Sequence, residues 1–220
     1  MIAAAKSNGV KLMESFMYRH HPRILEAREM VRSGVIGSPK TIVSAFTFKL
    51  NNTNDIRYQS EMGGGALMDV GCYCVNITRL MAGREPITVQ AKANWASSGV
   101  DEQLAGIMDF GEGLVAHFDC GFTQSDRQHC TVAGTDAYLD IPKPFLPGKG
   151  ESLIHEERGQ QFSRDHKFAG ADEYRMIAED FMWAIAGEAP PYPIKDSVAN
   201  MEVIQALLAS AKQNGIPITL

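Results

Sequence analysis

Two strands joined by a tight turn are predicted by the run Gln103-Leu-Ala-Gly-Ile-Met-Asp-Phe-Gly-Glu-Gly-Leu-Val-Ala-His-Phe-Asp-Cys120. Residues 103–110 and 114–120 have strand-like composition, and Asp109-Phe-Gly-Glu-Gly113 supplies the small and acidic residues of a hairpin turn. Segments of similar composition lie on both sides of the hairpin, at 88–96, 128–134 and 137–141. The sequence therefore predicts an antiparallel sheet in the middle of the chain.

Further strands and several helices are predicted around this sheet. Thr41 to Leu50 alternates in the manner of a long strand, and short strands are expected to continue near residues 152–163. Helices are expected at His21–Ser33, Ala66–Met81 (stopped by Gly83), Glu173–Ala186 and Ser197–Gln213, the last with Asp196 or Ser197 as its N-cap. The predicted fold class is α+β, with a large, open, mostly antiparallel sheet and helices on one face.

The first residues are typical of the end of a different unit. Ile2–Ser7 is predicted to be helical, Asn8-Gly9 to stop that helix, and Val10–Phe16 to form a short strand. Because a domain rarely begins with the last turns of a helix, we interpret this segment as the tail of an α/β unit whose front is absent. The boundary with the sheet domain is expected near residues 15–22.

Composition excludes several classes of protein. The 220 residues are 45% hydrophobic and 21% charged, as in an ordinary globular protein, which excludes wholesale disorder. A net charge of -5 without a Lys/Arg run argues against a nucleic-acid binder. No apolar stretch approaches the roughly 20 residues of a membrane helix. Four cysteines without a C-x-x-C pattern, and no secretory signal, favour the cytoplasm.

The sharpest local feature is the run Gly63-Gly-Gly-Ala-Leu-Met-Asp-Val-Gly-Cys-Tyr-Cys-Val-Asn76. A triple glycine before a helix allows a close approach of the backbone and leaves free amides at the positive end of the helix. Asp69 and Tyr73 are four residues apart, so they share one helix face, and Asn76 falls near the same stripe. These side chains predict a polar wall in a pocket. The alternative is a capped helix with buried, hydrogen-bonded polar groups.

A second cluster, Glu14-Ser-Phe-Met-Tyr-Arg-His-His-Pro22, lies at a predicted strand-to-helix junction. Ligands of α/β proteins bind beyond the carboxyl ends of strands, where Tyr18 and Arg19 would lie. The alternative is a charged surface loop. The chain has no G-x-G-x-x-G after a strand, no Walker phosphate loop and no H-E-x-x-H, so a metal site is not expected.

Three segments together resemble the glucose–fructose oxidoreductase / inositol dehydrogenase / MocA family. They are residues 13–22, residues 63–73 and the closing Gly215-Ile-Pro-Ile-Thr-Leu220, and the resemblance runs along essentially the whole chain. Members of that family join an N-terminal Rossmann domain, which binds NAD or NADP, to a C-terminal α+β domain whose open sheet often builds the oligomer. They oxidise or reduce sugars, cyclitols and related alcohols.

The resemblance implies a division of this chain. Residues 1–18 would be a remnant of the dinucleotide-binding domain, and residues 19–220 would form the C-terminal substrate and oligomerisation domain. The cofactor motif and the family's Glu-Lys-Pro lysine would lie upstream of Met1. The full-length parent is then expected to use NADP or NAD, and this fragment alone to bind neither and to be inactive. A homodimer or homotetramer through the sheet is implied; the alternative is a non-catalytic module for sheet-mediated dimerisation or sugar binding.

The resemblance also implies roles for single residues. Asp69 and Tyr73 match the family's Asp…His active-site helix, with Tyr in place of His as in the xylose and dihydrodiol dehydrogenase branch. Tyr73 would exchange the proton at the reacting oxygen, and Asp69 would orient the hydroxyls of a small sugar or alcohol. A phenol has an ordinary pKa of about 10, so a nearby cation must lower it. Contacts to substrate or cofactor are further implied for Arg19, Tyr18, Asn76, Gly64 and Gly65.

Overall fold

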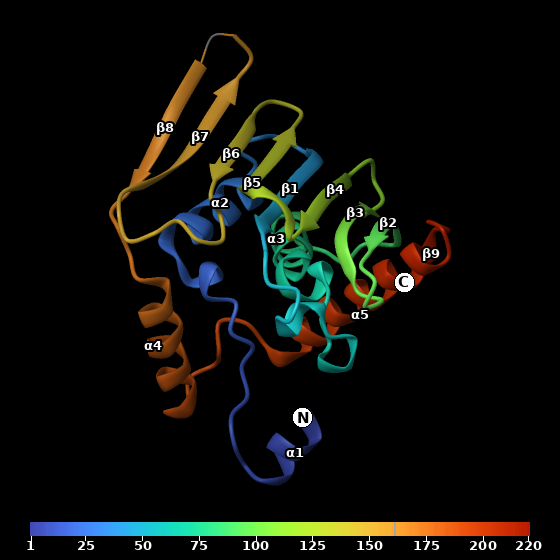
Figure 1. The fold of residues 1–220 in the computed structure, drawn as a ribbon. Helices are drawn as coiled ribbons and strands as arrows, with labels where there is room; N and C mark the ends of the chain where they lie inside the picture. Colours follow the sequence, from blue (N-terminus) through green and yellow to red (C-terminus); the bar gives the residue numbers. More distant parts are fainter. Residues whose placement is uncertain (161) are drawn as a thin grey trace.

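A nine-stranded sheet forms the centre of the computed structural model, which describes residues 1–160 and 162–220 (Figure 1). The strand order is β8-β7-β6-β5-β1-β4-β3-β2-β9, in which β1 and β4 are parallel and the other described neighbours are antiparallel. The predicted α+β class with an open, mostly antiparallel sheet is confirmed. The strands are β1 (Pro39–Lys49), β2 (Thr88–Trp95), β3 (Asp101–Asp109), β4 (Val115–Gly121), β5 (Thr123–Gly134), β6 (Tyr138–Pro142), β7 (Ser152–Arg158), β8 (Phe162–Phe168) and β9 (Ile218–Thr219).

Helices lie against one face of this sheet. Helix α3 packs on β1 and β4, α5 packs on β2, and α2 contacts α3 and β7, while α1 and α4 extend away from the sheet (Figure 1). No helix of the described residues is long and apolar enough to cross a membrane. The helices are α1 (Ile2–Ser7), α2 (Pro22–Arg32), α3 (Cys72–Ala82), α4 (Glu173–Ile185) and α5 (Ile194–Lys212), with short turns η1 (Met17–His20), η2 (Ile56–Tyr58), η3 (Ser60–Met62) and η4 (Leu67–Gly71).

The core lies between the helices and the sheet because the strands are apolar on that side. In β3, Leu104 and Met108 are buried, whereas Ala105 and Ile107 are exposed. Successive side chains of a strand point to opposite faces, so this alternation separates a core face from an outer face. Burial of the core face contributes roughly 25 cal/mol for each Å² of apolar surface removed from water.

Helix α2 begins at Pro22, as the pair His21-Pro22 predicts. Nδ1 of His21 accepts a hydrogen bond from the backbone N–H of Arg23 at 3.1 Å, which satisfies one of the free donors of the first turn. The fixed φ of proline suits the first helical position. The turn η1 therefore leads directly into the helical layer.

Helix α5 begins earlier than the sequence predicts. Its first residue is Ile194, so the predicted N-cap at Asp196 or Ser197 is wrong. Asp196 lies in the first turn, and its carboxylate accepts hydrogen bonds from Arg19 at 2.5 Å and from Arg79 at 3.0 Å. The carboxylate oxygens of Asp196 therefore bind two guanidinium groups from distant parts of the chain and do not accept hydrogen bonds from the described part of the backbone as an N-cap would.

The segment before η1 also differs from the prediction in part. Helix α1 forms as predicted, but Val10–Phe16 forms no strand, so that prediction is wrong. A strand needs a neighbour for its N–H and C=O groups, and no strand of the described residues pairs with this segment. Val10 accordingly remains 59% exposed.

Candidate active site

The predicted helix 66–81 forms in two parts. Leu67–Gly71 makes a π-helical turn, and α3 continues from it until Gly83, which ends the helix with a φ of +68°. Oδ2 of Asp101, from β3, accepts a hydrogen bond from the backbone N–H of Leu67 at 2.7 Å. A strand thus anchors the start of the helix, and the wider π turn fits one more residue into it.

The glycine triplet lets the chain pack against itself. Gly63 and Gly65 have φ values of +73° and +121°, which side chains rarely allow. A Cβ on Gly64 would lie 2.5 Å from the carbonyl oxygen of Arg57, and a Cβ on Gly65 would collide with the carboxylate of Asp101. The structure therefore places Gly64 and Gly65 against the protein's own backbone and side chains, and not at the cavity described next.

Asp69 and Tyr73 line one open cavity of about 490 Å³. Apolar side chains form part of its wall, and charged side chains from distant loops and strands form the rest. The structure thus brings the predicted carboxylate and phenol to the same hollow, in a mixed environment that suits a small polar ligand. The other lining residues are Met17, Phe46, Thr47, Phe48, Arg57, Val70, Asp126, Arg127, Gln128, Lys143, Leu146 and Tyr174.

The ring of Tyr73 is fixed by aromatic neighbours. Its centroid lies 5.0 Å from that of Phe16, 5.7 Å from Phe46 and 5.5 Å from Phe145. Among the described residues, its hydroxyl makes one weak contact, to Sδ of Met17 at 3.7 Å. Burial, helped by nearby thiol, phenol and carboxyl groups, raises the pKa of Tyr73 well above its ordinary value. The phenol is therefore protonated at neutral pH and available as a proton donor.

The carboxylate of Asp69 is held by an arginine that the sequence reasoning missed. Nε of Arg57 donates to Oδ2 of Asp69 at 2.7 Å, and Nη1 of Arg57 donates to Oδ1 of Asp55 at 3.1 Å. The hydrogen bond to Asp69 raises the pKa of Arg57, although burial opposes this. Oδ1 of Asp69 accepts no hydrogen bond from a described side chain, which leaves it open to a ligand. The feature of the sequence that could have indicated this ion pair is the single arginine in the polar segment before the glycine triplet.

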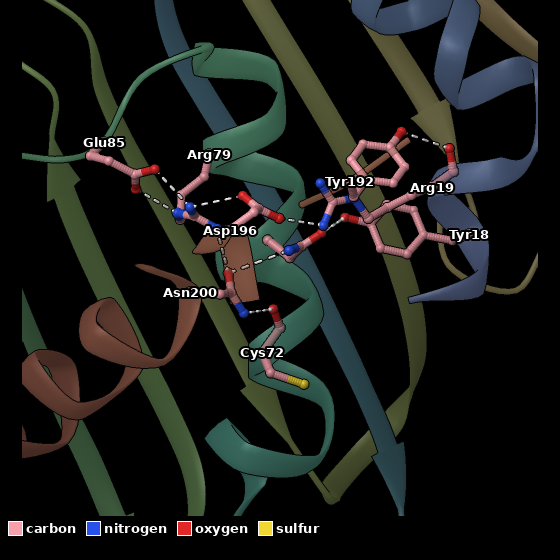
Figure 2. A network of polar contacts seen from close by, with 9 residues as sticks. Tyr18, Arg19, Cys72, Arg79, Glu85, Tyr192, Asp196 and Asn200 are labelled. Atoms are coloured by element: carbon pink, nitrogen blue, oxygen red, sulfur yellow. Dashed lines mark hydrogen bonds and ion pairs between the residues drawn. The ribbon is translucent and has the colours of Figure 1, made fainter. Parts of the chain in front are cut away.

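Tyr18, Arg19 and Asn76 do not line this cavity, although the ring of Tyr18 lies 5.9 Å from that of Tyr73. Tyr18 is fully buried, and its hydroxyl donates to Oδ1 of Asn76 at 2.6 Å. Nδ2 of Asn76 donates in turn to Asn200 at 3.5 Å, and Arg19 donates to Asp196. Figure 2 shows this network joining η1, α3 and α5. The alternative of buried, hydrogen-bonded polar groups therefore describes Asn76, whereas Asp69 and Tyr73 face the cavity.

Gly71→Ala is expected to lower the free energy of unfolding by about 1–3 kcal/mol, the usual cost of overpacking. A Cβ at this position would lie 2.6 Å from Sγ of Cys120 and 2.7 Å from Cδ1 of Leu67, so η4 would have to move away from β4. Urea-induced unfolding measures the effect. Gly150→Ala is the matched control, because its Cβ would meet nothing within 4 Å. Equal stability of the two variants would contradict tight packing of η4 against β4.

Known proteins resemble this chain in sequence along most of its length. Residues 24–140, more than half of the chain, match the family model described as "GFO/IDH/MocA C-terminal domain". A D-xylose 1-dehydrogenase (NADP(+)) of Haloferax volcanii is 33% identical over 208 residues, covering 93% of this chain and 63% of that protein. A trans-1,2-dihydrobenzene-1,2-diol dehydrogenase of Xenopus tropicalis is 27% identical over 219 residues, covering 97% of this chain and 65% of that protein.

A solved structure has the same fold. The crystal structure of KijD10, a 3-ketoreductase from Actinomadura kijaniata in complex with NADP and TDP-benzene, superposes with a TM-score of 0.88 at 26% identity, covering 95% of this chain and 65% of that one. This chain thus spans slightly under two thirds of the length of these relatives. The family match, the shared sheet and the relatives' identities agree with one another: the chain belongs to the GFO/IDH/MocA family, of which it carries the C-terminal domain.

Proposed function

We propose that this chain forms the substrate half of an NAD(P)-dependent oxidoreductase acting on the CH–OH group of a sugar, polyol or dihydrodiol. The observation that carries the proposal is a carboxylate, Asp69, and a phenol, Tyr73, on one cavity of about 490 Å³. Such a pair can bind hydroxyl groups and exchange the proton at a reacting oxygen. The relatives named a xylose dehydrogenase and a dihydrodiol dehydrogenase support the substrate class.

A nicotinamide cofactor, when bound, supplies or accepts the hydride. Residues 1–220 contain no G-x-G-x-x-G after a strand, and within the described part β1 and β4 are the only parallel neighbours. We therefore expect these residues not to form a dinucleotide site by themselves, and none is assigned to the nucleotide. We propose that residues 1–18 belong to a dinucleotide-binding domain and residues 19–220 to the substrate domain, and that these 220 residues alone show no turnover. The helix α1, which buries none of its residues, supports this division.

Tyr73 is proposed to donate a proton to the carbonyl oxygen in reduction and to accept one from the hydroxyl in oxidation. Burial raises the pKa of Tyr73, so the phenol carries its proton at neutral pH but is a weaker acid than an exposed tyrosine, and a cation beside it would also assist donation. Oxidation needs the phenolate, so a cation beside the phenol must lower that pKa. Asp69, held by Arg57 through Oδ2, is proposed to accept a hydrogen bond from a substrate hydroxyl through Oδ1.

The direct test is turnover by the protein expressed from its complete reading frame. D-xylose, other aldoses, cyclitols and trans-dihydrodiols are each offered with NAD⁺ and with NADP⁺, and formation of the reduced nicotinamide is followed by absorbance. Turnover of at least one pair is expected. Absence of turnover with every pair would contradict the proposal, and saturable sugar binding without turnover would favour a non-catalytic binding module.

Asp69→Asn is expected to lower kcat/KM by about one to two orders of magnitude, the loss expected when a charge-assisted hydrogen bond becomes a neutral one. The amide keeps the shape of the carboxylate but accepts a substrate hydroxyl more weakly. Steady-state kinetics measures the effect. Asp55→Asn is the matched control, because Asp55 also pairs with Arg57 but does not line the cavity. Equal losses in both variants would mean that Asp69 acts by holding Arg57.

The uncovered face of the sheet is proposed to bind a second copy of the chain, giving a homodimer or homotetramer. Ile107 of β3 is 48% exposed and Val115 of β4 is 42% exposed on this face. Apolar sheet surface of this kind is commonly buried against another subunit. Ile107→Lys is expected to shift sedimentation toward the monomer, whereas Ile185→Lys, at the exposed end of α4, leaves it unchanged. A monomeric wild-type protein would contradict the proposal.

A reducing compartment, the cytoplasm, is also proposed. All four cysteines are free, and Cys74, Cys120 and Cys130 are buried. Burial raises the pKa of the Cys74, Cys120 and Cys130 thiols, which keeps them protonated and unreactive. Unpaired buried thiols of this kind are usual where disulfides do not persist.

A further inference from the structure

A second cavity, of about 350 Å³, lies between α3 and the first turn of α5 and shares no lining residue with the cavity at Tyr73. Its charged lining is strongly unbalanced. Two carboxylates, Glu85 and Asp196, line it. They face five cationic side chains: Arg19, Arg28, Arg79, Arg84 and Lys195. In a chain with a net charge of -5, this is a local concentration of positive charge.

Two of these arginines are held rigidly. Arg79 donates to Glu85 through Nε at 2.6 Å and through Nη2 at 2.7 Å, and its Nη2 also donates to Asp196 at 3.0 Å (Figure 2). The guanidinium carbon of Arg19 lies 3.5 Å from the centre of the Tyr192 ring, and Nη1 donates to Asp196. Burial opposes the charge of Arg79, but Glu85 and Asp196 together raise its pKa. Hydrogen bonds and ring stacking therefore hold both guanidinium groups in fixed positions.

Other donors of this cavity lack an acceptor. Nε of Arg19 and Nε of Arg84 are buried and donate to no described residue, although Arg84 pairs with Glu112 through another nitrogen. A buried donor on a charged group is costly to leave without an acceptor. Arg28 and Lys195 are exposed and form no ion pair in the part of the chain that the structure describes. Four cationic side chains are thus able to bind an additional acceptor.

We propose that this cavity binds a small multivalent oxyanion of the phosphate class, either free or as the phosphoryl group of a larger molecule. A tetrahedral oxyanion offers several acceptors at once, and the planar guanidinium group matches such oxygens in pairs. Glu85 and Asp196 remain bound to Arg79 and Arg19, so the ligand adds to the network without replacing it. The proposal does not depend on the chemistry assigned to Asp69 and Tyr73.

The test is a calorimetric titration of inorganic phosphate into this 220-residue protein at constant ionic strength. Saturable binding is expected. Arg28→Gln combined with Lys195→Gln is expected to weaken it about a hundredfold, the effect of losing two charge-assisted contacts at about tenfold each. Both side chains are exposed, so thermal melts should show an unchanged fold. Arg32→Gln is the matched control, because Arg32 lies one turn along α2 from Arg28, pairs with Glu29 and does not line the cavity.

Several results would overturn the proposal. They are an absence of saturable phosphate binding, binding that chloride suppresses equally at the same ionic strength, and wild-type affinity in the double variant. Loss of binding in Lys143→Gln but not in the double variant would assign the phosphate to the cavity at Tyr73 instead, which also overturns it. Tighter binding of a sugar phosphate than of inorganic phosphate, lost in the double variant, would support the proposal with a larger molecule as the source.

Discussion

Tyr73→Phe is expected to lower kcat by about two to four orders of magnitude, the usual contribution of general acid–base catalysis, in the protein expressed from its complete reading frame. The phenol ring packs between Phe16 and Phe145, and phenylalanine keeps that packing. The lost hydroxyl contacts only Sδ of Met17 among the described residues, at 3.7 Å. The stability of the variant should therefore stay close to that of the wild type while turnover falls.

The control for this variant is a second phenol of the same cavity. Tyr174 also lines the cavity but is 59% exposed on α4. Tyr174→Phe should leave kcat within a few-fold of the wild type, and thermal melts of both variants check the fold. An unchanged kcat in Tyr73→Phe would remove Tyr73 from the mechanism, and equal losses in both variants would show a general effect of polarity in the cavity.

The elements that the sequence predicts well are those whose pattern is local. In β3, the alternation around Leu104 and Met108 separates the two faces of the sheet, and Gly83 marks the end of α3. The parallel pairing of β1 with β4 could not be predicted in this way. This pairing joins residues more than 70 positions apart, such as Thr41 and Val115. The alternation of apolar and polar residues in each strand does not depend on which strand lies beside it, so it does not identify the neighbour.

The errors have a common physical cause. Val10–Phe16 has the composition of a strand but finds no partner among the described strands, and Asp196 has the chemistry of a helix cap but binds Arg19 and Arg79. The π turn around Gly71 packs closely on β4, where a Cβ on Gly71 would lie 2.6 Å from Sγ of Cys120. In each case a distant contact decides the outcome, and local propensity does not contain it.

The residues of the candidate site also fall into two groups, those that local spacing predicts and those that distant segments contribute. Asp69 and Tyr73 were predictable because one helical turn places them on one face. Arg57 and Lys143 were not, since they reach the cavity from separate loops. Asn76 follows the same stripe, yet the hydroxyl of Tyr18 and the amide of Asn200 surround it in the interior. Helical spacing therefore placed Asp69 and Tyr73 at the cavity correctly. It did not place Asn76 correctly, although Asn76 lies only about one turn further along the helix.

The second large effect is expected at Glu173, a buried carboxyl group at the start of α4. Oε2 of Glu173 has no hydrogen-bond partner among the described residues. Arg23, the neighbouring buried cation, instead donates to the carbonyl oxygens of Pro142 at 2.8 Å and Lys143 at 2.7 Å. Burial raises the pKa of Glu173 from 4.5 to about 7, although the charge of Arg23 opposes the shift. Ionised Glu173 is therefore an unfavourable state of the folded protein.

The sign of the pH dependence follows from this shift. Below pH 4.5 the group is protonated in both the folded and the unfolded chain, so it has no effect on stability. Between pH 4.5 and about 7 the unfolded chain releases the proton that the folded chain retains, so the free energy of unfolding falls as the pH rises. Above that range the whole cost is present, about 3 kcal/mol at 1.36 kcal/mol for each pKa unit.

Glu173→Gln should remove this dependence. The free energy of unfolding of the variant minus that of the wild type should be about 3 kcal/mol larger at pH 8 than at pH 4.5. Urea unfolding of both proteins at both pH values measures this difference. Glu179→Gln, an exposed position on the same helix that pairs with Arg175, should differ between the two pH values by only about 0.5 kcal/mol. A pH-independent difference for Glu173→Gln would mean that Glu173 ionises normally.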